Sequence, residues 1–192
     1  LGDSEMRPRR PLLMAVGEGE FLLLWEPADS LAAPGVYQQR SADGGLTWSA
    51  PQRMADRPLL SAGEAVGLWG ADGQPLLAAQ EGVGQVALRA WLGAGGWSQP
   101  RPLEFSFVEP GADRVLLLSE VRLAVAGDAL GALGLDAEGR LWALRLALDE
   151  LSFAGAPVSP WQAPVRLDEA ASLSSVPALV ADGQGQLHAL WD

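Results

Sequence analysis

The chain has 192 residues, a formal net charge of −11 and no cysteine. These values exclude disulfides, thiolate chemistry and cysteine-ligated metals, and they argue against nucleic acid and anionic membrane surfaces as partners. Apolar residues make up 48% of the chain, so a sizeable core is expected. No apolar run approaches the roughly 18 residues of a membrane-spanning helix.

The N-terminal third predicts a short tail followed by one antiparallel sheet. Residues 1–10 are charged and proline-containing, which is typical of a flexible tail. From residue 11 to residue 56, short apolar segments alternate with glycine-rich turns, as in a sheet of four strands. The expected strands are Pro11–Val16, Phe21–Glu26, Gly35–Ser41 and Leu46–Met54.

The same alternation continues to the end of the chain. Residues 57–104 predict strands at Ala65–Trp69, Pro75–Gln80, Gln85–Leu92 and Gly96–Leu103. Residues 115–168 predict a first strand at Val121–Ala126 or at Ala129–Leu135, a second at Arg140–Leu148 and a last at Pro160–Leu167. Residues 173–192 supply only two strands, Val176–Val180 and Gln186–Trp191.

Two short phrases recur and indicate a structural repeat. One is Trp-x-x-Pro, beginning at Trp48, Trp97 and Trp161; the other is a turn glycine followed by an apolar strand, at Gly19, Gly73, Gly139 and Gly185. A unit of about 50 residues built from four short strands predicts a β-propeller blade. We therefore expect an all-β partial propeller of about three and a half blades.

The spacing of the two phrases is uneven in one place. From Trp97 to Gly139 there are 42 residues, against 25 from Trp48 to Gly73. About 17 extra residues are therefore expected near residues 104–119, as a loop or an added hairpin. Insertions of this kind carry binding functions in many folds.

The last unit is half a blade, and its apolar strands would leave an unpaired edge. We expect the rest of a longer chain, or another subunit, to complete the ring.

The eight tryptophans indicate packing more than ligand binding. Trp25, Trp69, Trp142 and Trp191 lie in or beside predicted strands, where core or inter-blade packing is expected. The role of Trp91 is left open between packing and a sugar-binding platform.

The segment Ser41-x-Asp43-x-Gly45-x-Thr47-Trp48 resembles the Asp-box of the bacterial neuraminidase repeat. This resemblance implies a sialidase-like β-propeller in which the box is a structural element distant from the catalytic face. Trp97 and Trp161 are then repeat anchors whose boxes have lost the Ser, Asp and Thr. We expect Asp43 to accept hydrogen bonds from turn amides and a hydroxyl, and Trp48 to fill space between neighbouring sheets.

The resemblance also implies which residues a sialidase would need: three arginines, a Tyr–Glu pair and an acidic Asp. Arg10-Pro11 matches only part of the early Arg-Ile-Pro motif, and Asp29 could stand for the acid. Tyr37, the only tyrosine, lies on a repeat strand. Arg10 and Asp29 are therefore weak catalytic candidates, the set is incomplete, and we do not expect an enzyme.

Other chemistry has little support. His188 is the only histidine, and no motif places a Ser, Cys or carboxylate beside it, which favours a structural role over a general base. The acidic turns lack the alternating carboxylates of a calcium loop, so neither a metal nor a cofactor is expected.

The sequence therefore favours a non-catalytic, sialidase-like propeller segment that binds protein or glycan, or that assists assembly. The family implies an exported protein, in the extracellular space, in the periplasm or at the cell surface. The alternative is part of a glycoside hydrolase of the exo-sialidase type, with its remaining catalytic residues outside this chain.

Overall fold

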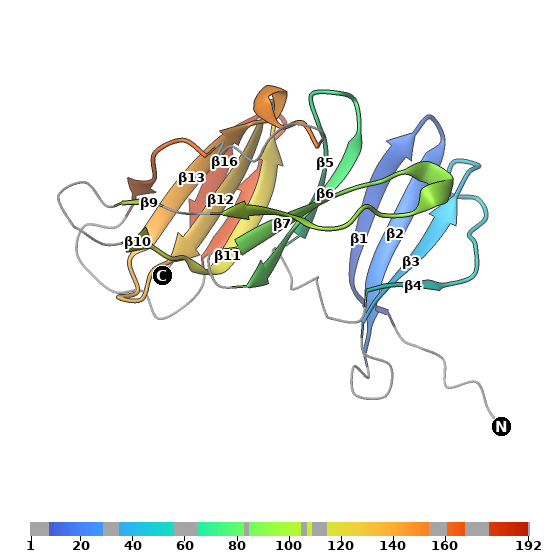
Figure 1. The fold of residues 1–192 in the computed structure, drawn as a ribbon, viewed down its shortest axis with the longest axis horizontal. Coiled ribbons are helices and arrows are strands. Elements are labelled where there is room, and N and C mark those ends of the chain that lie inside the picture. Colours follow the sequence, from blue (N-terminus) through green and yellow to red (C-terminus); the bar gives the residue numbers. More distant parts are fainter. Residues whose placement is uncertain are drawn as a thin grey trace. The chain divides into compact units, whose positions relative to one another are not determined.

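The computed structural model describes residues 8–28, 35–55, 65–82, 85–104, 107–108, 115–153, 161–167 and 177–191. The chain divides into two compact units, Leu1–Ala62 and Gly63–Asp192. The described residues form antiparallel strands, with two single-turn 3-10 helices at Gly93–Gly95 (η1) and Leu148–Glu150 (η2) (Figure 1). The all-β prediction is therefore confirmed.

The first unit contains one four-stranded sheet, here called the first sheet. Its strands are β1 (Pro8–Gly17), β2 (Glu20–Pro27), β3 (Val36–Ser41) and β4 (Gln52–Ala55), in that order. Two predicted boundaries were wrong. Residues 8–10, assigned to the tail, belong to β1, and residues 46–51, assigned to the last strand, precede β4.

The second unit contains two more four-stranded sheets and two strand pairs. The second sheet is β5 (Ala65–Trp69), β6 (Pro75–Gly82), β7 (Gln85–Ala90) and β8 (Arg101–Glu104). The third sheet is β11 (Ser119–Ala126), β12 (Ala129–Leu135), β13 (Leu141–Ala147) and β14 (Val165–Arg166). The pair β9 (Phe107–Val108) and β10 (Val115–Leu116) lies between them in sequence, and β15 (Ala178–Ala181) with β16 (Leu187–Leu190) forms the fourth sheet.

The third sheet corrects the predicted strand order. Both alternatives for its first strand are strands, β11 and β12, so the segment predicted as second, residues 140–148, is in fact the third. Gly139 therefore lies in the turn between the second and third strands, whereas Gly73 lies between the first and second. The expected excess of about 17 residues rested on equating these two glycines and was wrong. The hairpin alternative within residues 104–119 is confirmed by the pairing of β9 with β10.

In the second unit, sheets pack face to face through apolar side chains. The second and third sheets share one buried cluster that includes Leu76, Leu88, Leu130 and Leu144. The opposite face of the third sheet carries Leu133, Leu135 and Leu141, and Leu179 and Ala189 of the fourth sheet pack against these residues. The first strands are neighbours as well, because β11 contacts both β5 and β15. Each sheet of this unit thus covers the next.

Two glycines in β12 permit close packing. A Cβ on Gly131 would collide with Cδ1 of Leu187, and one on Gly134 would lie 2.8 Å from Cβ of Leu118. Glycine within a strand often marks such a close approach. Gly131 therefore allows the fourth sheet to pack closely against β12, and Gly134 allows the same for the segment that leads into β11.

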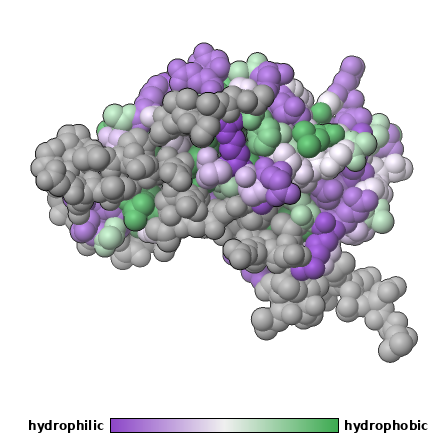
Figure 2. Space-filling model, viewed as in Figure 1, coloured by the Kyte–Doolittle hydropathy of each residue, from purple (hydrophilic) through white to green (hydrophobic). Residues whose placement is uncertain are grey.

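The tryptophans divide differently from the prediction. Trp25, Trp91, Trp142 and Trp161 are buried, but Trp69 and Trp191 are each 45% exposed. The core alternative was wrong for those last two, and the inter-blade alternative stays a prediction. The open question about Trp91 is answered by its burial and by its edge-to-face contact with Trp97, at 5.4 Å between ring centroids. On the face drawn in Figure 2, apolar and hydrophilic residues are interspersed over the described surface.

Candidate functional site

Arg10 has an unusual backbone conformation at one end of the first sheet. Arg9 pairs with Glu26 across β1 and β2, and a register shift follows between Arg9 and Leu12. Within this bulge Arg10 has a φ of 50°, the only positive value among the non-glycine residues that the structure describes. Pro11 comes next in the sequence. Positive φ is costly for arginine, and bulges and strained residues concentrate at functional sites.

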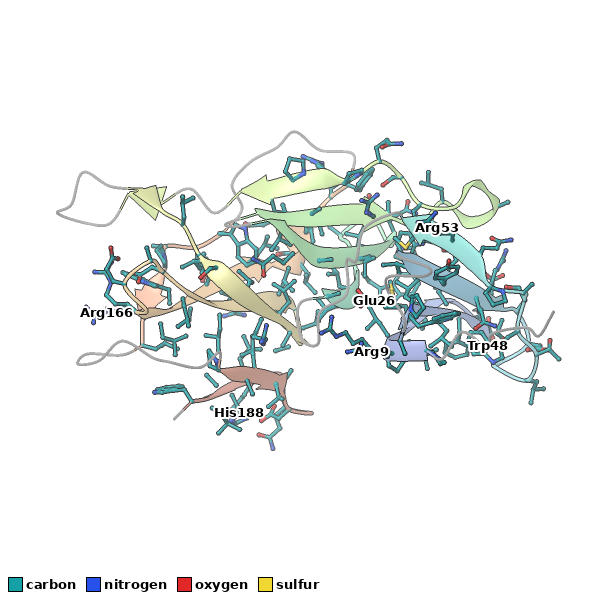
Figure 3. All side chains as sticks on the ribbon, turned by 90° about the horizontal axis from the view of Figure 1, so that it is seen from below. Arg9, Glu26, Trp48, Arg53, Arg166 and His188 are labelled. Atoms are coloured by element: carbon teal, nitrogen blue, oxygen red, sulfur yellow. The ribbon has the colours of Figure 1, made fainter. Side chains whose placement is uncertain are left out.

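A buried carboxylate holds the Arg10 side chain. Nη1 of Arg10 lies 3.4 Å from Oε2 of Glu26, and 40% of the Arg10 side chain is exposed against 10% of Glu26. The pair therefore presents a half-exposed cation that could receive an anionic or hydroxyl-rich ligand. Figure 3 places Arg9 and Glu26 together at this end of the sheet.

Two further residues were weighed for catalysis. Asp29 lies outside the described residues. Tyr37 stacks on Trp25 at 5.1 Å between ring centroids and 18° between ring planes. The Trp25 indole in turn donates a 3.2 Å hydrogen bond to Oε1 of Gln39. These contacts give Tyr37 a packing role. Glu26 was not singled out from the sequence, and its signal was a charge at the end of the apolar run 21–25.

The segment 41–48, here called the Ser41–Trp48 turn, follows β3. The Thr47 backbone N–H donates to Oδ1 of Asp43 at 2.9 Å, and the Thr47 hydroxyl donates to Oδ2 at 2.5 Å. The Ser41 hydroxyl donates to Oδ1 at 2.8 Å and accepts from the Gly45 N–H at 2.8 Å. The hydrogen bonds expected of Asp43 are thus present.

Glycine and tryptophan complete the Ser41–Trp48 turn. Gly44 and Gly45 have φ values of 75° and 90°, which explains the need for glycine there. The Trp48 indole donates to the Gly45 carbonyl at 3.1 Å, so Trp48 folds back over its own turn. Its expected position between sheets stays a prediction. In Figure 3, Trp48 lies at the opposite end of the first sheet from Arg9 and Glu26.

We expect Asp43→Asn to destabilise the first unit in a pH-dependent manner. The Thr47 hydroxyl and amide and the Ser41 hydroxyl lower the pKa of Asp43 from 3.8 to about 2. Because the folded-state pKa is depressed, the stability gained from the carboxylate is complete above the unfolded pKa and is lost as the pH falls through the folded pKa. Thermal unfolding followed by circular dichroism should show a lower Tm for the variant at pH 7. The gap should close between pH 3.8 and about 2. A gap that is constant down to pH 2 would contradict this role.

His188 has a structural hydrogen bond, as expected, but its carboxylate partner was not anticipated from the sequence. Its Nε2 lies 2.9 Å from Oδ2 of Asp182, across the β15–β16 turn. The hydrogen bond from His188 is the main reason why the pKa of Asp182 lies below its ordinary value. Oδ1 of Asp182 also accepts from the amides of Gln184 and Gln186, so the pair closes a turn. The missed signal was internal, since Asp136-x-x-Gly-x-Leu-Trp142 repeats as Asp182-x-x-Gly-x-Leu-His188.

The other two repeat tryptophans link the third strand of their sheet to the last. Trp97 forms an isolated antiparallel β-bridge with Trp91, and Trp161 forms one with Leu146. Trp97 is half-buried and Trp161 is 6% exposed within the core of the second unit. Both contribute to packing where the chain turns toward its last strand.

Two negative findings hold for the described part of the chain. It contains no group of three or more His, Cys, Asp or Glu side chains that could hold a metal ion. It also contains no helix of the length and hydropathy needed to cross a membrane.

Comparison with known proteins shows likeness in structure alone. No protein-family model and no curated protein matches the chain. An α-L-arabinofuranosidase from Podospora anserina, solved with cellotriose, matches with a TM-score of 0.49 and 15% identity, over 93% of this chain and 57% of that one. The catalytic domain of a GH62 α-L-arabinofuranosidase from Coprinopsis cinerea matches with a TM-score of 0.50 and 14% identity, over 93% of this chain and 58% of that one. A protein of unknown function from Dyadobacter fermentans matches with a TM-score of 0.48 and 15% identity, over 90% of this chain and 53% of that one.

The chain thus spans little more than half the length of these structures. At 14% identity the Coprinopsis match supports the all-β fold and nothing further. The sialidase-like assignment stays a prediction.

Proposed function

We propose that this chain is a sialidase-like propeller segment that acts as a non-catalytic binding and assembly module of an exported or surface protein. Its assembly surface is the fourth sheet, which needs strands from the rest of a longer chain or from another subunit. Protein or glycan is the expected ligand. The number of blades in the complete ring is left open.

The observation that carries this proposal is the exposed outer face of the fourth sheet. The first three sheets have four strands each, and the fourth has two in the described part of the chain. One face of it packs on the third sheet through Leu179 and Ala189. On the other side Val180 is 50% exposed and Leu190 is 66% exposed. These two exposed apolar side chains support an interaction at this face.

The test is the association state of the purified chain in sedimentation velocity. We expect concentration-dependent association that is weakened by the double substitution Val180→Ser and Leu190→Ser, because these side chains supply the exposed apolar area. A monodisperse 20.2 kDa monomer with a native β-sheet circular dichroism signal would contradict the proposal.

The alternative function, part of a glycoside hydrolase, is favoured by the strained Arg10 beside the buried Glu26. An assay with fluorogenic sialoside and arabinofuranoside substrates distinguishes the two. The proposal expects no turnover by the parent chain. Turnover that disappears in Arg10→Ala but persists in the matched control Arg9→Ala would overturn the non-catalytic assignment, because Arg9 is also exposed but has an ordinary φ.

A further inference from the structure

Three turns of the second unit share one hydrogen-bond pattern and fix the register of the strands that follow. Gly70, Asp136 and Asp182 each donate from the backbone N–H to the carbonyl four residues later: Gln74, Arg140 and Gln186. Each also accepts from the amide three residues later, of Gly73, Gly139 and Gly185. The residues that follow these turns, Pro75, Leu141 and Leu187, are therefore equivalent positions.

In the second and third sheets, the backbone carbonyl of the residue at this position accepts a hydrogen bond from the following strand segment. The Trp91 N–H donates to the Pro75 carbonyl at 2.9 Å, and the Leu167 N–H donates to the Leu141 carbonyl at 3.0 Å. By equivalence, the Leu187 carbonyl faces the side of β16 away from β15. Hydrogen-bonding direction alternates along an antiparallel strand, so the Ala189 amide and carbonyl face the same side. In the described part of the chain, no strand follows β16 in this sheet.

A shelf for a further strand lies beside this edge. Ala143 packs against the cluster that holds Leu179 and Ala189, so it belongs to the face of the third sheet that the fourth sheet covers. Val165 pairs directly with Ala143 and shares that face, but it is 59% exposed. The partly buried Ala143 of β13 and the exposed Val165 of β14 together form this shelf.

The edge itself lacks several of the features that prevent strand addition, although β16 is short. Leu187–Leu190 contains no proline, lysine or acidic residue, and its pairing with β15 has no bulge. Natural edge strands that stay unpaired are normally protected by such features. A strand added at this edge gains main-chain hydrogen bonds from β16 and apolar contacts from the shelf.

We propose that the β16 edge and the β13–β14 shelf together form a strand-capture site. Its occupant is an extended polypeptide segment with apolar side chains at alternate positions, which pairs antiparallel with β16 and packs those side chains on Ala143 and Val165. This inference rests on the proposed assembly function and specifies where an added strand pairs with the fourth sheet. The outer face with Val180 and Leu190 is a separate surface.

The probe is a synthetic peptide of residues 139–149, in which Trp142, Leu144 and Leu146 alternate. A scrambled peptide of the same composition is the control. Titration into the labelled chain, followed by amide hydrogen exchange, should show new protection at the amides of Leu187 and Ala189. Methylating the peptide nitrogens that face β16 should abolish binding, and methylating those on the opposite edge should not.

Matched variants locate the site. Val165→Asp on the shelf should weaken peptide binding about tenfold, and Val180→Asp, at similar exposure on the outer face, should leave it unchanged. Ala189→Pro should also weaken binding about tenfold, since it removes a donor from the free edge only.

Three results would overturn the inference: no binding of the peptide, protection elsewhere, or equal effects of the two aspartates. If the chain associates in sedimentation and one of these results is found, the assembly function stands and the capture site fails. A stable monomer that ignores the peptide refutes both.

Discussion

Replacing Asp136 with alanine is expected to destabilise the second unit by about 3–5 kcal/mol, the range for breaking a buried, hydrogen-bonded ion pair. Its side chain is 3% exposed, with Oδ2 at 2.6 Å from Nε of Arg140. The Trp142 indole also donates to Oδ2, at 2.9 Å, and two turn amides donate to Oδ1. Alanine would leave a buried indole N–H and a mostly buried guanidinium without this acceptor.

Asp72→Ala is the matched control for this prediction, because Asp72 lies in the equivalent turn of the second sheet but is exposed. It accepts from the Gln74 amide at 3.2 Å, and its loss should change stability by only about 0.5 kcal/mol. Urea unfolding followed by tryptophan fluorescence measures both variants. Equal losses in the two would show that the buried network around Asp136 adds nothing.

Gly134→Ala is expected to destabilise the second unit by about 1–3 kcal/mol, the usual effect of overpacking a core. The added Cβ would lie 2.8 Å from Cβ of Leu118, which is fully buried at 0% exposure. Neither a strand backbone nor a Cβ can move freely, so the sheet must shift. Differential scanning calorimetry of the variant measures the loss.

Two further variants test whether contact with Leu118 is the cause. Leu118→Ala alone should cost about 2–5 kcal/mol, and the double variant should lose less than the sum of the two. Gly183→Ala is the control, because a Cβ added there would meet no atom within 4 Å and the φ of Gly183 is not in the left-handed region. Full additivity, or an equal loss in Gly183→Ala, would contradict the packing explanation.

Much of the fold could be predicted because strand and turn signals are local. Alternating apolar residues and turn glycines placed most strands within a few residues of β1–β8. The misassigned strand order in the third sheet came from a turn that repeats in sequence but not in position. The Asp136 turn and the Asp182 turn have the same hydrogen bonds, yet one joins the second strand to the third and the other joins the first to the second. Which two strands a turn connects depends on how the strands pair in the sheet, and a short local motif carries no information about that pairing.

The candidate sites were predicted less completely, for a similar reason. The Ser41–Trp48 turn could be anticipated because its side-chain hydrogen bonds close within eight residues. Arg10 was found through its Arg-Pro context, but Glu26 lies 16 residues away and becomes its partner only through the pairing of β1 with β2. The Val165 shelf depends on which residues of β14 oppose β13, and that register is not readable from two exposed residues.

Residue-resolved amide hydrogen exchange on the isolated chain tests the central claim most directly, namely that the fourth sheet is built as half of a sheet with an open edge. The predicted result is slow exchange at His188, whose amide faces β15, beside fast exchange at Leu187 and Ala189. Slow exchange at Leu187 and Ala189 in a monomeric chain would show that the edge is already paired, and would contradict the claim.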